Sequence, residues 1–188
     1  MKKYLYVLVI VVVLSWTLSG CEVSISGKSP GGGITATPVA TASSGIPKFG
    51  VQTRTSGCVA HGGLADSACT PGAIFPNATV QAICKSGYAS SVRNVPASEK
   101  DQVYAEYGIT HHSAGQYEVD HLISLELGGS NDIANLWPEA ASPTPGFHQK
   151  DQVENYLHDQ VCSGGISLRE AQNEIATNWL AVYNRMPK

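Results

Sequence analysis

The sequence has 188 residues, with 12 lysines and arginines against 15 aspartates and glutamates and a formal net charge of −3 at pH 7. This length suits one domain with a single core beside any export or linker segment. The acidic balance argues against a protein that holds nucleic acid by charge alone. Activity on phosphates would therefore depend on a bound cation and on a local basic group such as Arg93, Lys100, Lys150 and Arg169.

The first residues are typical of an export signal. Lys2 and Lys3 precede an apolar run over residues 5–18. This run is shorter than the roughly 20 residues of a membrane-spanning helix, so an uncleaved anchor is the weaker reading. The Leu-Ser-Gly-Cys that ends at Cys21 resembles a bacterial lipobox. That resemblance implies a signal peptide over residues 1–20, acylation of Cys21 and an exported lipoprotein on the extracytoplasmic face of the cell membrane.

Residues 21–46 are predicted to be a flexible tether. From Ser24 to Ile46 they are mostly Ser, Gly, Thr, Pro and Ala without apolar periodicity, so they bury too little surface to order themselves. The globular domain is accordingly expected over residues 47–188. Without residues 1–20 the chain has 10 basic against 15 acidic residues, a net charge of −5.

The first part of the domain indicates mainly loops. Residues 57–79 are rich in Gly, Ala and Pro and predict a loop with at most a short hairpin. A strand is predicted over residues 80–84. A short helix is predicted over residues 98–107, because Ser98 and Asp101 resemble a capping box.

Strands and longer helices are predicted in the second part of the domain. A strand is expected over residues 117–123, and a short one over 136–137, which Pro138 ends. Apolar residues at steps of four predict a helix over 149–161, and Ser167 caps the last helix. The apolar face of this last helix contains Leu168, Ala171, Ile175, Trp179 and Val182.

Four cysteines follow Cys21, and an even number in an exported domain argues for two disulfides. The absence of any Cys-x-x-Cys spacing argues against a structural zinc site. Sequence alone leaves three pairings open. We favour Cys58 with Cys69, because the Gly-rich stretch between them can fold back on itself, which leaves Cys84 with Cys162.

One stretch carries most of the chemical information. Asp120-His121 lies at the end of one predicted strand, Asn135-Leu136 begins the next after a Gly-rich link, and the following helix has a histidine and acidic residues at its start. An Asp-His pair alone is weak evidence for a catalytic site, because such pairs usually form only a surface hydrogen bond. The surrounding order of strand, loop, strand and helix gives the pair its significance.

This order resembles the ββα-metal core of HNH endonucleases, most closely a group of small secreted bacterial members. The matching motifs are Val-Asp-His-Leu-Ile from Val119, Leu-Gly-Gly-Ser-Asn from Leu127, Asn-Leu-Trp-Pro from Asn135 and Lys-Asp-x-x-Glu from Lys150. The likeness covers about residues 84–183, with the core at 117–161. It implies an α+β fold with flanking helices and an enzyme that hydrolyses DNA or RNA.

The resemblance assigns roles to three residues. His121 is implied as the general base, because a neutral imidazole can take a proton from water. Asp120 is implied as a hard oxygen ligand of a divalent cation. Asn135 is implied to lock the long loop by side-chain hydrogen bonds, without binding metal. Neighbours in a strand point to opposite faces, so Asp120 and His121 share a site only if the strand ends or bulges there.

The third position of the motif stays open. His148 is the best match, and Glu154 is the second choice. Either one would complete the site of a single divalent cation, with Mg expected first and Mn, Zn or Ni compatible. Lys150 and Arg93 are candidates for contact with a substrate phosphate, although a lysine on a helix is more commonly solvated.

The sequence thus predicts a monomeric, metal-dependent endonuclease that is tethered to the membrane by the lipid on Cys21 and acts on nucleic acid. One alternative is a catalytically inactive ββα lipoprotein that binds nucleic acid or cell wall, which the acidic balance and the open third ligand favour. Another is a disulfide-stapled structural lipoprotein without a ligand. Asp120, His121 and Asn135 together favour the enzyme, because a pure binder needs no base beside a metal ligand.

Overall fold

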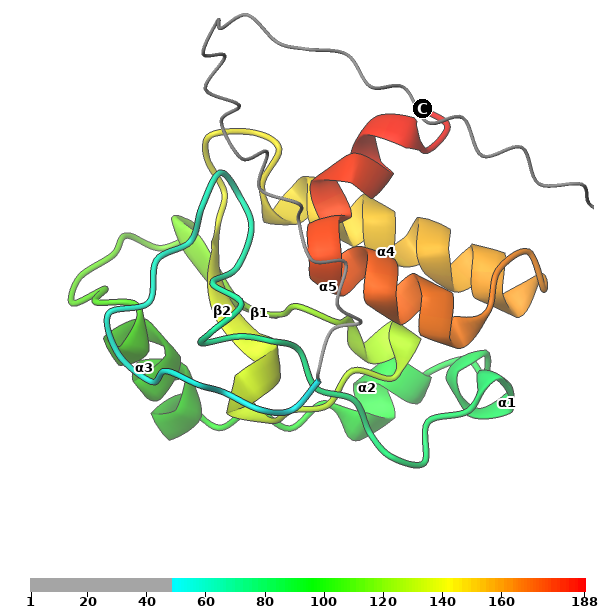
Figure 1. Ribbon diagram of the computed structural model, residues 1–188, viewed down its shortest axis with the longest axis horizontal. Coiled ribbons are helices and arrows are strands. Elements are labelled where there is room, and N and C mark those ends of the chain that lie inside the picture. Colours follow the sequence, from blue (N-terminus) through cyan, green and yellow to red (C-terminus); the bar gives the residue numbers. More distant parts are fainter. Residues whose placement is uncertain (1–48) are drawn as a thin grey trace, which may run out of the picture. The chain divides into compact units, whose positions relative to one another are not determined.

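The computed structural model describes residues 49–188, and these form a two-stranded antiparallel sheet and five α-helices (Figure 1). The predicted signal peptide over 1–20, the lipidation site Cys21 and the tether over 21–46 lie outside the described residues. The predicted mixture of helix and strand is confirmed. No helix within residues 49–188 is long and apolar enough to cross a membrane.

The sheet is a hairpin of β1 (Tyr117–His121) and β2 (Leu136–Ala140), joined by a long loop. The register pairs Tyr117 with Ala140 at one end and His121 with Leu136 at the other, without a bulge. The prediction that Pro138 ends the second strand is wrong, because β2 continues to Ala140. In a two-stranded sheet each strand is an edge, where proline is tolerated.

Two short 3₁₀ helices shape the loop between the strands, at Leu125–Leu127 and Ile133–Asn135. Gly129 makes the closest approach in this loop, because a Cβ on it would lie 1.8 Å from the carbonyl oxygen of Ile123. Only glycine allows two stretches of backbone to approach this closely. The Gly-Gly pair therefore lets the loop fold tightly back onto the end of β1.

The two long helices, α4 (Phe147–Cys162) and α5 (Leu168–Arg185), pack against each other beside the hairpin (Figure 1). Both were predicted, α4 two residues shorter at its start. The Ser167 hydroxyl accepts a hydrogen bond from the Glu170 N–H at 3.1 Å, the expected cap of α5. The shared apolar core consists of Val153, Leu157, Val161, Ala171, Ile175, Trp179 and Val182.

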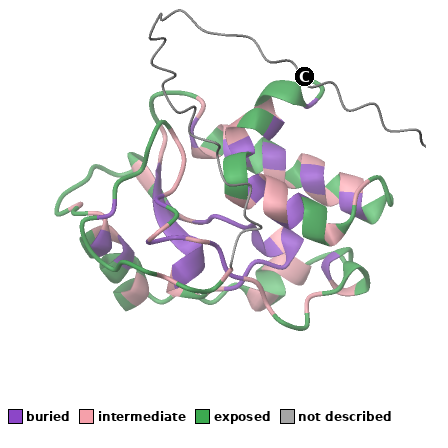
Figure 2. Ribbon diagram, viewed as in Figure 1, coloured by how far each residue is buried: buried purple, intermediate pink, exposed green. Residues whose placement is uncertain are grey.

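The other side of the hairpin is covered by α3 (Ala97–Glu106), which forms a second small core of Val103, Val119 and Leu136. Figure 2 shows the buried residues concentrated on the hairpin and on the facing sides of α4 and α5. The predicted helix is present here, but Pro96 precedes it and no side chain caps it, so the predicted Ser98 cap is wrong.

The strand predicted over residues 80–84 is also wrong, because α1 (Val80–Ile83) forms there. The Thr79 hydroxyl accepts a hydrogen bond from the Ala82 N–H at 3.2 Å, which satisfies one free donor of the first turn. A further short helix that was not predicted, α2 (Tyr88–Val92), follows. The hairpin expected within residues 57–79 is reduced to one bridge between His61 and Leu64.

Two disulfides staple the domain, Cys58–Cys69 and Cys84–Cys162, as predicted. The first closes a local loop, with 11 residues of sequence separation. The second spans 78 residues and joins the end of α1 to the end of α4. It therefore fixes the helix that carries Lys150 and Glu154 to the first part of the domain.

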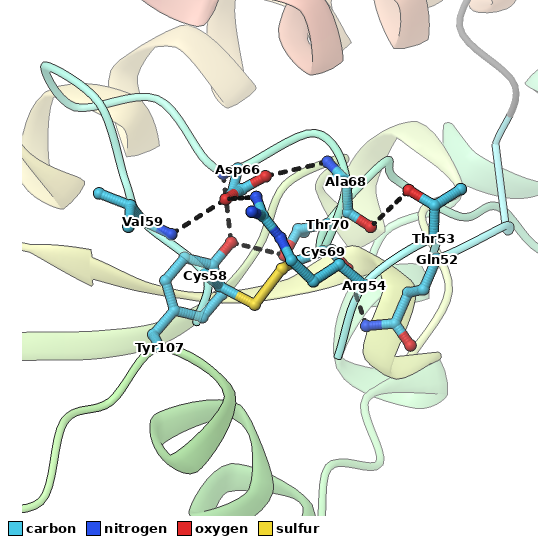
Figure 3. Close-up of polar contacts among 10 residues, drawn as sticks. All are labelled: Gln52, Thr53, Arg54, Cys58, Val59, Asp66, Ala68, Cys69, Thr70 and Tyr107. Carbon is cyan, nitrogen blue, oxygen red and sulfur yellow. Dashed lines mark hydrogen bonds and ion pairs between the residues drawn. A yellow bond between two sulfur atoms is a disulfide. The ribbon is translucent and has the colours of Figure 1, made fainter. Parts of the chain in front are cut away.

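The Cys58–Cys69 loop is organised around the buried side chain of Asp66 (Figure 3). The carboxylate accepts backbone N–H groups from Val59 and Ala68, each at 3.0 Å, and forms an ion pair with Arg54. These contacts replace regular secondary structure, so that a segment without a strand or helix still has a fixed shape.

Candidate active site

Asn135 fixes the loop that connects the two strands. Its side chain is fully buried, and its Oδ1 accepts the N–H of Ile123 at 2.9 Å and of Ala73 at 3.3 Å. Its Nδ2 donates to the carbonyl oxygens of Ile123 at 2.9 Å and Ser130 at 2.8 Å. The amide thus uses its full hydrogen-bonding capacity on backbone, and the loop after His121 is held to the start of β2.

His121 is the last residue of β1, and its side chain meets a second asparagine of the loop. Its Nε2 lies 3.2 Å from Oδ1 of Asn131. The orientation of that amide is fixed independently, because Oδ1 accepts the Asn94 N–H at 3.1 Å and Nδ2 donates to the Val92 carbonyl at 2.8 Å. His121 therefore donates through Nε2, and the lone pair of its imidazole is on Nδ1.

His121 is neutral at physiological pH. Burial is the largest cause and lowers the pKa of its imidazole to about 4, although the charge of Asp120 acts in the opposite direction. The residue is only 2% exposed. A neutral imidazole with a fixed tautomer is the form that can accept a proton from water or from a hydroxyl group.

A cavity of about 370 Å³ lies beside His121. Two exposed basic side chains, Arg93 from the end of α2 and Lys100 from α3, contribute to its wall. Glu118 of β1 also lines it, so its wall carries charges of both signs. The aromatic side chains of its wall are Tyr104, Tyr117 and Phe147.

Asp120 points to a different partner. The register continues through Asp120 opposite Trp137 and His121 opposite Leu136, so strand alternation sends the two side chains apart. Oδ2 of Asp120 accepts a hydrogen bond at 2.6 Å from Nζ of Lys150 on α4. Burial alone would raise the pKa of Asp120, but the ammonium of Lys150 outweighs it and holds this pKa below its ordinary value.

Lys150 is buried completely, with 0% of its side chain exposed. Its Nζ donates to Asp120, to the main-chain oxygen of His121 at 2.9 Å and to the carboxylate of Glu154. Burial would lower the pKa of this ammonium, but the surrounding carboxylates raise it. Burial raises the pKa of Glu154 to about 8, against the opposing charge of Lys150.

Glu139 of β2 adds a third carboxyl to this group. The residue is 1% exposed, and its carboxyl shares a hydrogen bond with that of Asp120. Burial raises the pKa of Glu139 to about 10, with the charges of Asp120 and Glu154 contributing to the increase. Its carboxyl is therefore protonated at neutral pH. We call Asp120, Glu139, Lys150 and Glu154 the buried charge cluster.

Comparison with known proteins gives the site no relative. No family model, no curated protein and no solved structure matches this chain.

The structure brings together most of the residues that the sequence singled out. Asp120 and Glu154 share the ammonium of Lys150, and Arg93 lines the cavity at His121. His148 has no contact with this group, is exposed and packs edge-to-face with Phe147, with ring centroids 4.3 Å apart. Lys150, expected to reach a phosphate, instead has no exposed surface.

Sequence reasoning did not identify Asn131 or Glu139. Asn131 belongs to the Gly-Gly-Ser-Asn segment of the motif, so its place in the loop was visible, but its partner His121 was not. Glu139 follows Asn-Leu-Trp-Pro and lies in a strand that was predicted to end before it. No local pattern distinguishes it from a solvated glutamate.

The residues around Asp120 do not fit the expected divalent cation as they are arranged. Oδ2 of Asp120 already accepts the ammonium of Lys150, and a cation on either oxygen of this carboxylate would lie within a few ångströms of that positive charge. Within residues 49–188, one group of three His, Cys or acidic ligand atoms lies within 4.8 Å, namely Cys84, His158 and Cys162. Two of these sulfurs form a disulfide, which leaves no thiolate to bind a metal.

Proposed function

We propose that this chain is a nuclease that hydrolyses phosphodiester bonds of DNA or RNA, with His121 as general base. The observation that carries the proposal is the state of His121: a neutral imidazole, with its lone pair on Nδ1, on the wall of a cavity that also carries Arg93 and Lys100. The order β1, β2 and α4 supports a ββα core of the HNH type. The two disulfides support an exported location.

The proposed chemistry assigns each group a task. The guanidinium of Arg93 and the ammonium of Lys100 hold the phosphate and offset its charge in the transition state. His121 Nδ1 accepts the proton of a water molecule whose oxygen attacks phosphorus. The bond from phosphorus to one ester oxygen breaks, and that leaving oxygen takes a proton from solvent, which gives a phosphomonoester and a free hydroxyl. Asn131 keeps the imidazole in the required tautomer, and Asn135 holds the loop on which Asn131 lies. The proposed mechanism uses no metal ion at Asp120, because the ammonium of Lys150 already contacts Oδ2 of this residue.

The second candidate is a binder of nucleic acid that does not cleave it. The ammonium of Lys150 at Asp120 favours this alternative, because cleavage of phosphodiesters commonly depends on a bound metal ion, whereas binding does not. The same cavity would then hold a phosphate between Arg93 and Lys100 without reaction. In both cases the membrane anchor on Cys21 and the monomeric state stay predictions.

The test is cleavage by the purified full-length chain. Supercoiled plasmid and a single-stranded RNA are each incubated with Mg, Mn, Zn or chelator, and Arg93→Gln is assayed in parallel. The nuclease converts at least one substrate, and Arg93→Gln raises its KM because a phosphate contact is lost. If plasmid and RNA remain intact in every condition while Arg93→Gln weakens their binding, the chain is the binder and the proposal is wrong.

A further inference from the structure

We propose that the ammonium of Lys150 serves as a built-in cation at Asp120, which excludes a divalent ion there, and that loss of this ammonium opens a carboxylate site for one. The statement about ion binding does not depend on the proposed function. Its consequence for catalysis, that cleavage at His121 needs no metal on Asp120, rests on the proposed function.

The ammonium of Lys150 has no free hydrogen-bond donor. An ammonium has three N–H donors, and here they meet three oxygens, from Asp120, from Glu154 and from the main chain of His121. A divalent ion held by Asp120 would require carboxylate oxygens of the same pocket at roughly 2.0 to 2.6 Å. Two cations a few ångströms apart in a buried site repel each other strongly. The ammonium therefore excludes a divalent ion in two ways: it occupies the oxygens, and its charge repels a second cation.

The side chain of Lys150 cannot move out of this position without a large loss of stability. Its side chain has no exposed surface, and it extends from the second turn of α4 to the end of β1. Moving it into solvent would leave the carboxylate of Asp120, which is only 15% exposed, without its counter-charge, and this is strongly unfavourable. The ammonium is thus a fixed part of the site.

The buried charge cluster contains more carboxyl groups than one lysine needs as counter-charge. A buried lysine needs one carboxylate for neutrality, yet three carboxyls belong to the buried charge cluster. The protonated Glu139 carboxyl hydrogen-bonds to Asp120 and is not among the three acceptors of the Lys150 ammonium. Without the Lys150 ammonium, Asp120, Glu139 and Glu154 would offer a hard oxygen set of the kind that Mg and Mn prefer.

Lys150 also acts on the base through the main chain. Its Nζ holds the carbonyl oxygen of His121, so it is a positioning residue for the imidazole as well as a counter-charge. Loss of activity in a Lys150 variant alone would not separate these effects from a structural role. Gain of ion binding separates them, because a residue needed only for packing would not create an ion site when removed.

The experiment measures Mn²⁺ binding to the full-length chain by equilibrium dialysis. Lys150→Ala removes the charge and leaves space, and Lys150→Met removes the charge but fills the space. We expect Lys150→Ala to bind one Mn²⁺ at least about tenfold more tightly than the wild type or Lys150→Met. Adding Asp120→Asn to Lys150→Ala should remove the gained site. The exposed Lys85, which does not line the cavity at His121, gives the control Lys85→Ala, which should gain no Mn²⁺ binding.

Three outcomes overturn the proposal. The first is a wild-type chain that binds one Mn²⁺ which Asp120→Asn abolishes. The second is a folded Lys150→Ala variant that gains no Mn²⁺. If Lys150→Ala does not fold alone, folding restored by Mn²⁺ supports the proposal, because a ligand stabilises the state that binds it, and failure of Mn²⁺ to restore it is the third contradiction.

Cleavage assays keep this proposal distinct from the proposed function. Cleavage by the wild type that persists in chelator supports both. Cleavage that requires a metal bound through Asp120 contradicts the role of Lys150 and leaves the nuclease intact. If no substrate is cleaved in any condition, the nuclease proposal fails, while the Mn²⁺ measurements still decide whether Lys150 excludes the ion.

Discussion

Two aspartates of this domain, the buried Asp66 and the half-buried Asp120, both pair with a cation but lie in different surroundings. Asp66 accepts two backbone N–H groups and pairs with Arg54, whose side chain is 47% exposed (Figure 3). These contacts hold the Cys58–Cys69 loop and the segment before it. Asp120 instead pairs with a lysine that has no exposed surface, in a cluster of three carboxyls around one ammonium.

This difference separates polar groups that stabilise the fold from polar groups that take part in function. Burial is costly for any polar group, so a purely structural network tends to satisfy each of its members. The Asp66 network does so with local backbone. The buried charge cluster holds three carboxyls around one ammonium, next to the neutral imidazole of His121. We therefore interpret the Asp66 region as structural and the region from Asp120 to His121 as functional.

The largest effect is expected from His121→Ala. Loss of a general base costs roughly 100- to 10,000-fold in rate, so plasmid or RNA cleavage should nearly disappear in protein that circular dichroism shows to be folded. His111→Ala is the control, because His111 is exposed and should keep the wild-type rate. Equal rates for the two variants would break the assignment of function to the Asp120–His121 region.

The two disulfides allow the stability of the two regions to be compared. Cys84→Ser should lower the free energy of unfolding by roughly 2 to 5 kcal/mol, because the bridge to Cys162 closes a long loop and fixes α4. Cys58→Ser should cost roughly 1.5 to 2 kcal/mol less, since its loop is much shorter. Urea titration followed by tryptophan fluorescence measures both. A reversed order would show that the Asp66 loop, rather than α4, limits stability.

Asn131→Ala tests the positioning of the base. The variant keeps His121 but removes the acceptor that fixes its tautomer, so kcat should fall roughly 10- to 100-fold with little change in KM. Asn131→Asp is the matched variant, because it keeps an acceptor oxygen and should recover part of the rate. If Asn131→Ala changes KM alone, the amide contacts substrate and does not orient His121.

The smallest effect is expected from Asp66→Asn, and it concerns stability rather than activity. Burial would raise the pKa of Asp66, but the Val59 N–H, Arg54 and the Ala68 N–H together lower it. A carboxyl with a lowered folded-state pKa contributes stability above its unfolded pKa of about 4 and loses it as pH falls through the folded pKa. Asp66→Asn should therefore cost about 1 to 3 kcal/mol at neutral pH and less in acid. A loss that does not shrink in acid would contradict this explanation.

Much of the fold could be predicted from the sequence where the pattern is local. The cap at Ser167 and the apolar steps of α5 are set by spacing along one helix, and the cysteine pairing agreed with the loop between Cys58 and Cys69. The run over residues 80–84 is too short for periodicity to separate a strand from a helix. There the cap at Thr79 decided for a helix.

The candidate site was predictable as a set of residues but not as a set of contacts. Asp120, His121 and Asn135 stand out by their motif, whereas the burial of Lys150 depends on how α4 rotates against the hairpin. A lysine among charged neighbours on a helix has the sequence signature of a solvated residue. Only the packing of α4 shows that its ammonium lies at the oxygen where a metal was expected.

The most direct test of the central claim is the pH dependence of kcat/KM for cleavage by the wild-type chain, between about pH 3 and pH 8, with folding checked at each pH. A neutral, buried His121 predicts a rate that is half-maximal near its pKa of about 4 and constant from slightly above that pH to neutrality. A rate that is half-maximal near the ordinary histidine pKa of about 6.5 would show that the base is solvated and is not His121 as the structure places it.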